Sequence, residues 1–241
     1  MWQANVFTVF PEAFPGSLGV SVIGKALKLN KWNLNIIDLK QFPAKLDRID
    51  FPPFGGGAGM VLSPLTFEMA FNLLGENQKN MRKIYFSPRG RQFNQTDIQD
   101  LADSHGVTML CGRYEGVDQR ILDYYSFDEI SIGDFVLSGG EVAAMAIIES
   151  CVRLLPNIVG NTASICDDSF KNCLLEYNQY TKPQVFNGLS VPDVILSGNH
   201  EKIDEFRASQ SKKITQKRRT DLWKKYIAMK MKSIRKQKNT F

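Results

Sequence analysis

The chain has 241 residues, of which 43% are hydrophobic and 23% are charged. This composition is typical of a globular protein with one or two domains, and it is too apolar for intrinsic disorder. No apolar stretch reaches the roughly 18 residues of a membrane-spanning helix, and the first residues show no basic leader or cleavage site. We therefore expect a cytoplasmic protein that does not contact a membrane.

Charge is distributed unevenly along the chain. From Glu201 to the C-terminus there are 14 basic and 4 acidic residues, a net charge of +10, whereas the whole chain carries +5. The residues before Glu201 therefore have a net charge of −5. A basic segment attached to an acidic body indicates a polyanionic partner, although a solvated lysine-rich helix would produce the same pattern.

The cysteines and histidines argue against a zinc site, which needs about four nitrogen or sulfur ligands, usually clustered in pairs. The four cysteines form no CxxC pair and the two histidines are far apart: Cys111, Cys151, Cys166, Cys173, His105 and His200. We expect reduced thiols that are mostly buried.

The first two-thirds of the chain predict strands that alternate with helices. Short apolar runs predict strands at residues 6–10, 34–39, 84–86 and 107–111. Helices are predicted after Ser63-Pro64, from a capping box at residues 96–99 to Gly106, and across residues 141–155. This alternation favours an α/β domain with a mainly parallel sheet.

Beyond residue 160 the pattern changes. Asn, Asp, Ser and Pro become frequent, and strand-like runs vanish as far as about residue 198. Residues 220–238 predict a helix with Trp223, Ile227 and Ile234 on one side and lysines on the other. We expect a domain at residues 1–160, a linker at 161–175 and a small basic helical domain at 176–241.

Three glycine-rich segments stand out: PFGGGAGMVL at 53–62, CGRYEGVDQR at 111–120 and SIGDFVLSGGE at 131–141. None is a GxGxxG or GxxxxGK[ST] phosphate motif. Glycines let the backbone approach a ligand closely, and ligands of open α/β sheets bind beyond the carboxyl ends of strands. Any one of these segments could be a tight turn, but three after strand-like runs indicate a nucleotide-like ligand.

These segments carry a family resemblance together with FPEAF, FSPRGR, DDSF, YTKP and LSGNH, which occur in a fixed order from the start of the chain to about Leu222. The chain resembles the bacterial tRNA (guanine-N1)-methyltransferases of the SPOUT superfamily. The resemblance implies an α/β domain with a mainly parallel sheet and a deep trefoil knot, followed by a small helical C-terminal domain. Periodicity gives no sign of a knot, and knots are rare in proteins.

The resemblance implies that S-adenosyl-L-methionine binds in a pocket formed by the knotted loops. Backbone groups would read the adenine edge while apolar side chains enclose the ring. The matching positions are Ser87, Pro88, Gly112, Tyr114, Ile132, Gly133, Asp134, Phe135, Val136, Leu137, Gly139 and Gly140.

The family methylates N1 of the guanine immediately 3′ of the anticodon in tRNA. N1 carries a proton, so a base must remove it, and the resemblance assigns this role to Asp168. It assigns to Arg153 the stabilisation of negative charge on the guanine O6, and it implicates Glu115 in magnesium-dependent catalysis, although no metal site is evident. Structural alternatives are a helix cap for Asp168, a helix-dipole contact for Arg153 and an ion pair of Glu115 with Arg113.

The implied partners are the tRNA anticodon stem-loop and a second copy of the chain, which would share each active site. The target guanine would have to leave its stack, with Phe170 and Tyr180 as stacking platforms. Phosphate contacts are expected from Arg207, Lys212, Lys213, Lys217, Arg218 and Arg219. A non-catalytic RNA-binding module and a related knotted methyltransferase acting on ribosomal RNA remain as alternatives. The DDSF segment and the C-terminal domain match the tRNA enzymes.

Overall fold

The computed structural model describes residues 1–44, 47–159 and 168–238. The chain forms two compact units, Met1–Gly160 and Asn161–Phe241. Among the described helices, none combines the length and the apolar character that crossing a membrane requires.

The first unit contains a five-stranded sheet in which every pair of neighbouring strands is parallel. In spatial order the strands are β2 (Trp32–Asp38), β1 (Trp2–Thr8), β6 (Gly106–Leu110), β5 (Arg82–Gln92) and β7 (Asp128–Ser131). A separate antiparallel pair joins β3 (Asp50–Phe51) to β4 (Val61–Leu62). The predicted α/β architecture with a mainly parallel sheet is confirmed.

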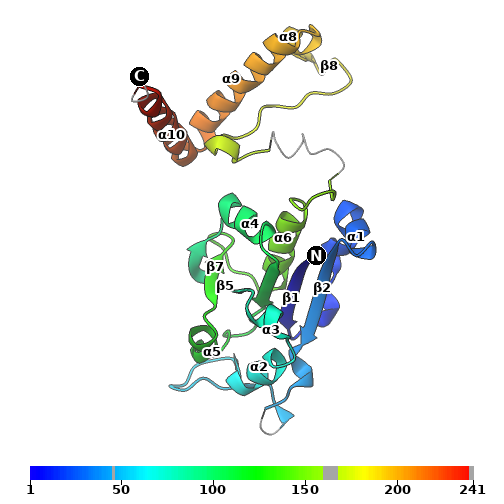
Figure 1. Cartoon of the computed structure of the whole chain (residues 1–241), viewed down its shortest axis with the longest axis vertical. Helices are drawn as coiled ribbons and strands as arrows, with labels where there is room; N and C mark the ends of the chain where they lie inside the picture. Colours follow the sequence, from blue (N-terminus) through cyan, green and yellow to red (C-terminus); the bar gives the residue numbers. More distant parts are fainter. Residues whose placement is uncertain (45–46, 160–167, 239–241) are drawn as a thin grey trace. The chain divides into compact units, whose positions relative to one another are not determined.

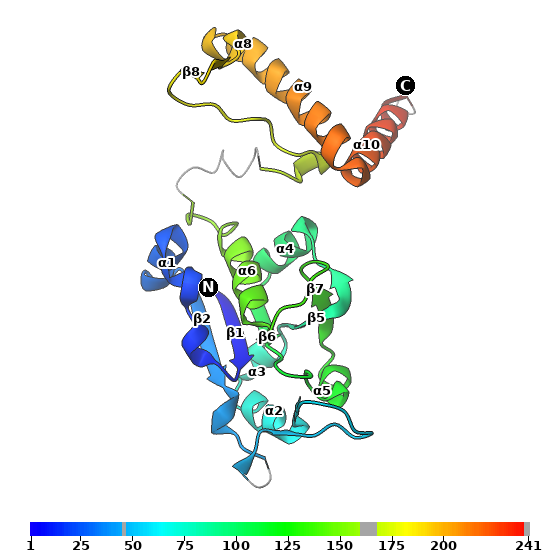
Figure 2. The same cartoon turned by 180° about the vertical axis from the view of Figure 1, so that it is seen from behind.

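Helices cover both faces of this sheet (Figures 1 and 2). They are α1 (Ser21–Lys28), α2 (Pro64–Phe71), α3 (Glu76–Lys79), α4 (Gln95–Ala102), α5 (Gln119–Tyr124) and α6 (Glu141–Val152), with 3-10 turns at Pro11–Ala13, Gly16–Gly19 and Leu39–Gln41. Successive strand residues point to opposite faces. Val6 therefore packs in a core with residues of α1, α4 and α6, whereas Phe7 packs with residues of α2 and α5. Because both faces are covered, β6 is buried at every position.

Two of the predicted helices have wrong boundaries: α4 at both ends and α6 at its C-terminal end. The capping box forms at Asn94, whose side chain accepts a hydrogen bond from the Thr96 amide at 2.9 Å, while Asp97 accepts one from the Asn94 amide at 3.0 Å. Helix α4 therefore starts and ends earlier than predicted, and Gly106 instead begins β6. Helix α6 ends at Val152 rather than at residue 155, because the following amides of Leu154 and Leu155 bond to carbonyls only three residues back.

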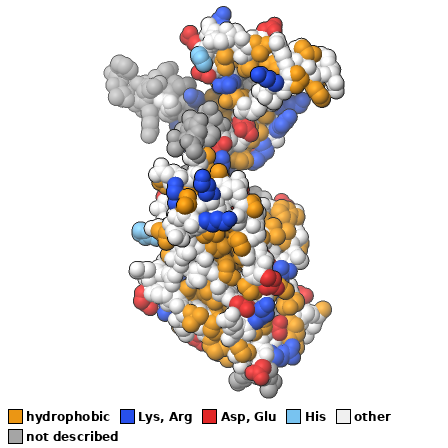
Figure 3. Space-filling view, turned by 90° about the vertical axis from the view of Figure 1, so that its right-hand side faces the viewer, with side chains coloured by type: hydrophobic (Ala, Val, Ile, Leu, Met, Phe, Trp, Pro, Cys, Tyr) orange, Lys and Arg blue, Asp and Glu red, His pale blue; other side chains and the backbone are white. Residues whose placement is uncertain are grey.

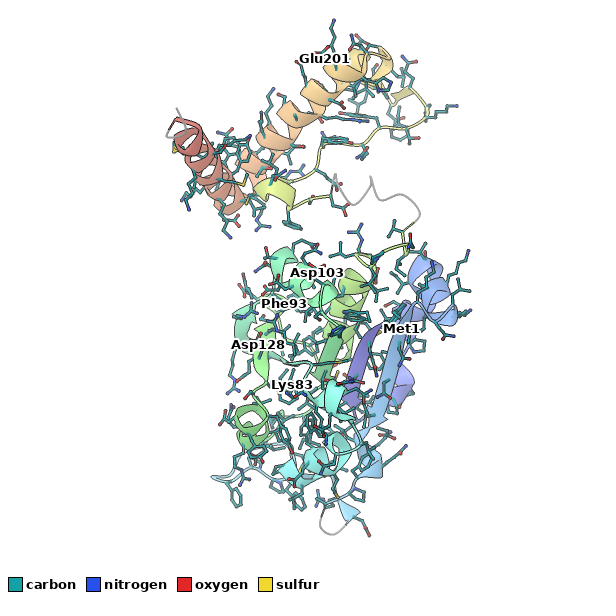
Figure 4. The ribbon with its side chains drawn as sticks, in the orientation of Figure 1. Met1, Lys83, Phe93, Asp103, Asp128 and Glu201 are labelled. Atoms are coloured by element: carbon teal, nitrogen blue, oxygen red, sulfur yellow. The ribbon has the colours of Figure 1, made fainter. Side chains whose placement is uncertain are left out.

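Strand β5 continues well past Phe86, where the sequence predicts its end. It runs through Pro88 and Gly90, and its pairing with β7 shifts register between Phe86 and Arg91. Such an irregularity accommodates a proline inside a sheet. Beyond the shift, Arg91 and Arg82 both bond to Asp128 of β7, near the ring of Phe93 (Figure 4). These contacts hold β7 against the lengthened strand.

The second unit is mainly helical, with α8 (Asp193–Leu196), α9 (His200–Arg218), α10 (Thr220–Lys238) and a 3-10 turn at Lys171–Cys173. The bounds of α10 are those predicted. A small hairpin of β8 (Val185–Phe186) and β9 (Leu189–Ser190) corrects the expectation that strands vanish here. Its turn is Asn187-Gly188, with positive φ at both residues, which is a recognised hairpin signal in sequence.

The core of the second unit is thin. Leu222 and Tyr226 of α10 are buried, and Ile203 and Thr215 of α9 are buried with them. The Thr215 hydroxyl also accepts a hydrogen bond from the Leu175 amide at 2.8 Å. The predicted apolar face of α10 is therefore displaced, since Trp223 and Ile227 are only half-buried; the side chain of Ile234 lies outside the described ones.

Candidate active site

A cavity of about 530 Å³ lies beyond the carboxyl ends of β6 and β7 and beside the register shift of β5. This volume lies within the range of about 300–1,000 Å³ that is usual for small-molecule sites. Every residue expected to bind the cofactor lines it except Asp134, which accepts a hydrogen bond from Gln92 at 3.3 Å. The predicted residues that line the cavity are Ser87, Pro88, Gly112, Tyr114, Ile132, Gly133, Phe135, Val136, Leu137, Gly139 and Gly140.

The cavity wall combines apolar side chains with main-chain groups. Ile132 and Leu137 supply apolar surface, and the turn between them is shaped by Ser131, whose hydroxyl donates to the Gly133 carbonyl at 2.9 Å. Ser87 is buried in the wall, and its hydroxyl accepts from the Arg89 amide at 3.2 Å. A lining of this kind suits a flat heterocycle whose edge is read by backbone groups.

Close approach of two chain segments explains the glycines of the third motif. The Gly140 amide donates to the Gly112 carbonyl at 3.2 Å, which joins the second motif to the third. A Cβ at Gly140 would lie 2.8 Å from the Cα of Cys111, although φ is −79° and any residue could adopt it. Space, and not conformation, therefore requires glycine here.

The first glycine motif behaves differently. Gly55 and Gly56 have positive φ, and a Cβ on either would have no atom within 4 Å. Among the described residues of this segment, none lines the cavity. It is an exposed turn, which was the structural alternative for an isolated glycine cluster.

Glu115 and Arg113 both line the cavity but do not pair with each other as the structural alternative expected. Arg113 forms an ion pair with Glu141, with Nη2 3.0 Å from Oε2. Glu115 is exposed, and its side chain lies so close to Gly59 that a Cβ there would be 2.5 Å away. Glu115 therefore lies between the cavity and the first glycine motif.

The thiols of Cys111 and Cys151 are buried. Burial, reinforced by the nearby Glu141 carboxylate, raises the pKa of Cys111 well above its usual value. Burial also raises the pKa of Cys151 to about 12. Both remain protonated near neutral pH, as expected for buried structural cysteines; Cys166 lies outside the described residues.

The other two predicted catalytic residues do not line this cavity. Arg153 is the half-buried C-cap of α6, the position that its helix-dipole alternative requires. Asp168 is half-buried in the second unit. The first described helical turn after it begins at Lys171. Its neighbour Asp167 lies outside the described residues.

No group of three or more His, Cys, Asp or Glu side chains is placed to hold a metal ion within residues 1–44, 47–159 and 168–238.

Exposed cations are spread over the second unit, some of them visible in Figure 3. Lys212, Lys213, Lys217 and Arg218 are exposed, and in the described part of the chain they make no ion pair. Two other predicted phosphate contacts are engaged within the chain. Arg207 lies 4.7 Å from the ring centroid of Tyr177, and Arg219 bonds to both carboxylate oxygens of Asp221, at 2.9 and 2.7 Å.

Comparisons with known proteins agree with this architecture. The family model described as tRNA (guanine-1)-methyltransferase TrmD matches residues 2–225. A protein of Ehrlichia canis named tRNA (guanine-N(1)-)-methyltransferase is 52% identical over 91% of this chain and 94% of its own length. Proteins of the same name from Ruegeria pomeroyi and Ehrlichia ruminantium are 48% and 49% identical, covering 95% and 92% of this chain and 96% and 95% of their own lengths. The chain therefore belongs to the tRNA (guanine-1)-methyltransferase (TrmD) family of the SPOUT superfamily.

Proposed function

We propose that this protein transfers the methyl group of S-adenosyl-L-methionine to N1 of the guanine immediately 3′ of the anticodon in tRNA. The observation that carries the proposal is the convergence of two glycine motifs on one strand-end cavity, in a chain of the TrmD family. A tRNA substrate makes the cytoplasm the expected location. The deep trefoil knot within residues 1–160 stays a prediction of the family resemblance.

The cavity suits the proposed methyl donor. Its apolar walls at Ile132 and Leu137 can enclose adenine, and the main chain around Gly139 can approach its edge. When bound, S-adenosyl-L-methionine supplies an electrophilic methyl group on a sulfonium. The protein's contribution at this site is to bind the donor and fix its orientation.

In this proposal Asp168 is the general base, because N1 of guanine must lose its proton as the new bond forms. A positioned base contributes roughly 10²- to 10⁴-fold to such a step. Arg153 stabilises the negative charge that develops on the guanine O6. The cations of residues 176–241 hold the anticodon stem-loop through its phosphates, and Phe170 and Tyr180 are exposed enough to stack on bases.

We propose that the active protein is a homodimer in which one subunit supplies Asp168 and the other the cofactor cavity. Support comes from apolar side chains near the cavity that are left exposed, namely Tyr114, Phe135, Val136 and Val142. A cluster of this kind marks an interaction surface. A magnesium-dependent role for Glu115 stays a prediction, and comparing rates with magnesium and with EDTA tests it.

Mixing two inactive variants tests the shared site. Asp168→Asn should lack the base, and Gly140→Val should block the cavity because residue 140 has no room for a side chain. Subunit exchange in an equal mixture makes about half of the dimers mixed, with one subunit of each variant. Each mixed dimer has one site with both Asp168 and an open cavity, so about a quarter of the wild-type number of active sites should be restored. If each site belonged to a single subunit, the mixture would remain inactive.

The reaction itself is tested with labelled methyl donor and unmodified tRNAs that carry guanine or adenine next to the anticodon. Only the guanine tRNA should be methylated, and Asp168→Asn should abolish turnover while cofactor affinity stays unchanged. Equal methylation of both tRNAs would refute the base-specific proposal. Full activity of Asp168→Asn would remove that residue from the role of base, and tRNA binding without methylation would favour a non-catalytic module.

A further inference from the structure

A buried chain of polar groups lies behind the cofactor cavity, and the proposed reaction does not use it. It joins Thr8, at the end of β1, to Glu141, at the start of α6, and to Arg113, in the loop after β6. The Thr8 hydroxyl donates to Glu141 Oε1 at 2.7 Å and accepts from the Phe10 amide at 2.9 Å. The Glu141 side chain is 3% exposed, so its charge is removed from water.

Arg113 connects these buried polar groups to both loops of the cavity. Its Nη1 donates to the Ser138 carbonyl at 3.2 Å, and its Nη2 forms the ion pair with Glu141. The guanidinium carbon lies 4.4 Å from the ring centroid of Phe10, which limits its movement on that side. The backbone of Arg113 also bridges to Gly139. One side chain therefore holds the loop at residues 111–116 against the loop at residues 138–140.

Glu141 is buried and the Arg113 side chain is 26% exposed, and an ion pair largely removed from water is a poor device for stability alone. The desolvation of two charges offsets most of their attraction, and well-packed apolar residues in the same place are often equally stable. What Arg113 adds is position: it donates a hydrogen bond to the Ser138 carbonyl, while its Nη2 lies 3.0 Å from Glu141 Oε2 without the alignment of a hydrogen bond. Glu141 Oε2 and Arg113 Nε are therefore buried polar atoms without a hydrogen-bond partner in the described part of the protein, which stability alone would not favour. The pair lies where two backbone segments have to present their polar groups to one ligand.

We infer that Arg113 and Glu141 are positioning residues that set the spacing of the two backbone segments which bind the methyl donor, with Thr8 orienting the Glu141 carboxylate. The inference rests on the proposed function, in which this cavity binds S-adenosyl-L-methionine. Neither carboxylate nor hydroxyl has to touch the donor. Cofactor affinity should depend on the directional contacts and not merely on filling the buried space.

Replacing all three polar residues with apolar ones distinguishes a role in positioning the cavity loops from a role in stability. Glu141→Leu alone leaves the Arg113 charge unpaired and should lower the Tm by more than about 5 °C. The triple variant Thr8→Val, Arg113→Met, Glu141→Leu should recover most of that Tm. Its affinity for S-adenosylhomocysteine, measured by calorimetry, should nevertheless stay at least about tenfold weaker than that of the wild type. Recovery of affinity together with Tm would overturn the inference.

Arg113→Lys is a milder variant that keeps the positive charge but loses the planar guanidinium, which reaches two partners at once. A lysine ammonium can reach Glu141 or the Ser138 carbonyl without fixing both. We expect a Tm within a few degrees of the wild type, a KM for the methyl donor raised about tenfold, and an unchanged KM for tRNA. The matched control is Arg120→Lys, which alters a bidentate pair with Asp118 that does not line the cavity.

The outcomes distinguish this inference from the proposed function. If the wild-type protein fails to bind S-adenosylhomocysteine, the proposed function fails. If the wild type binds it and Arg113→Lys binds it equally well, only the positioning role is overturned. An equal loss of affinity in Arg113→Lys and Arg120→Lys would also overturn it, because the effect would then not be specific to the loops.

Discussion

The two units of the chain bury their side chains to different extents. The Met1–Gly160 unit buries polar groups such as Asn5, Thr8 and Glu141 and builds its cavity from tightly packed loops. Among its described residues, the Asn161–Phe241 unit buries few side chains, on α9 and α10, and it leaves Lys212, Lys213, Lys217 and Arg218 exposed to water. Binding a small ligand requires backbone groups that are already in position, whereas a polyanion can be bound by exposed charges on a unit with a small core.

The largest expected effect is on the core that supports the cavity. Ile148 of α6 is completely buried, and Ile148→Ala should lower the free energy of unfolding by about 2–5 kcal/mol. Because α6 begins at the cavity loop, cofactor affinity should fall as well. Urea unfolding and calorimetry measure the two effects.

The matched variant in the other unit is Ile203→Ala on α9. Its loss of stability should lie near the lower end of the same range, because the core there is shallow. Cofactor affinity should not change. A loss of cofactor affinity in Ile203→Ala would show that the two units are not independent in this respect.

The next effect concerns the close approach at Gly140. Gly140→Ala should cost about 1–3 kcal/mol, since the new methyl group would press on the backbone of Cys111. Cofactor affinity should fall with it, because the two motifs are forced apart. Gly75→Ala is the control, with φ of −68° and no atom closer than 3.8 Å to the new Cβ, and it should cost less than about 1 kcal/mol.

Removing cations from the second unit should weaken tRNA binding without changing cofactor binding. Replacing Lys212, Lys213, Lys217 and Arg218 by Gln should weaken tRNA binding on the order of tenfold, or about 1.4 kcal/mol. The tRNA association constant should also depend less on salt concentration. The slope of its logarithm against the logarithm of the salt concentration should decrease in magnitude by about 0.7–0.9 for each phosphate that no longer contacts a cation. Cofactor affinity should stay unchanged. Lys25→Gln with Lys28→Gln, on exposed positions of α1, should leave tRNA binding unaltered.

The smallest effect is a pH dependence at the junction of α9 and α10. Hydrogen bonds from Arg219 lower the pKa of Asp221 to about 2, below the value of about 3.9 in an unfolded chain. The pair therefore stabilises the folded state above pH 3.9, and this stabilisation is lost as the pH falls towards 2. Asp221→Asn should be slightly less stable than the wild type at pH 7 and equally stable near pH 2. A stability difference that does not change with pH would contradict this account.

The sequence predicts those elements whose signals are local. Helix α10 has its predicted bounds, and α6 begins at Glu141 as expected, because glycines precede an apolar run. The continuation of β5 past Pro88 is not predictable in this way, since only pairing with β7 makes an extended proline segment part of the sheet. The β8–β9 hairpin, in contrast, has a local turn signal in Asn187-Gly188, which the scarcity of strand-like runs around it conceals.

The residues predicted to bind the cofactor follow from the family resemblance. The structure gathers nearly all of them around one cavity because they follow strands that end at one edge of the sheet. The pairing of Thr8 with Glu141 has no signal in the sequence. The two are 133 residues apart, and no periodicity links a strand end to a helix start over such a distance. For Arg113 the sequence suggests Glu115, the acidic residue nearest to it along the chain, whereas its carboxylate partner lies on α6.

The contact between Arg113 and Gly139 also bears on how the family can diverge. A Cβ at position 139 would overlap the Arg113 guanidinium and the Glu141 carboxylate, so a side chain there would have to displace both groups. Among natural variants of this protein, alanine at 139 should accompany a shorter residue at 113. Substitutions at the two positions should therefore occur together.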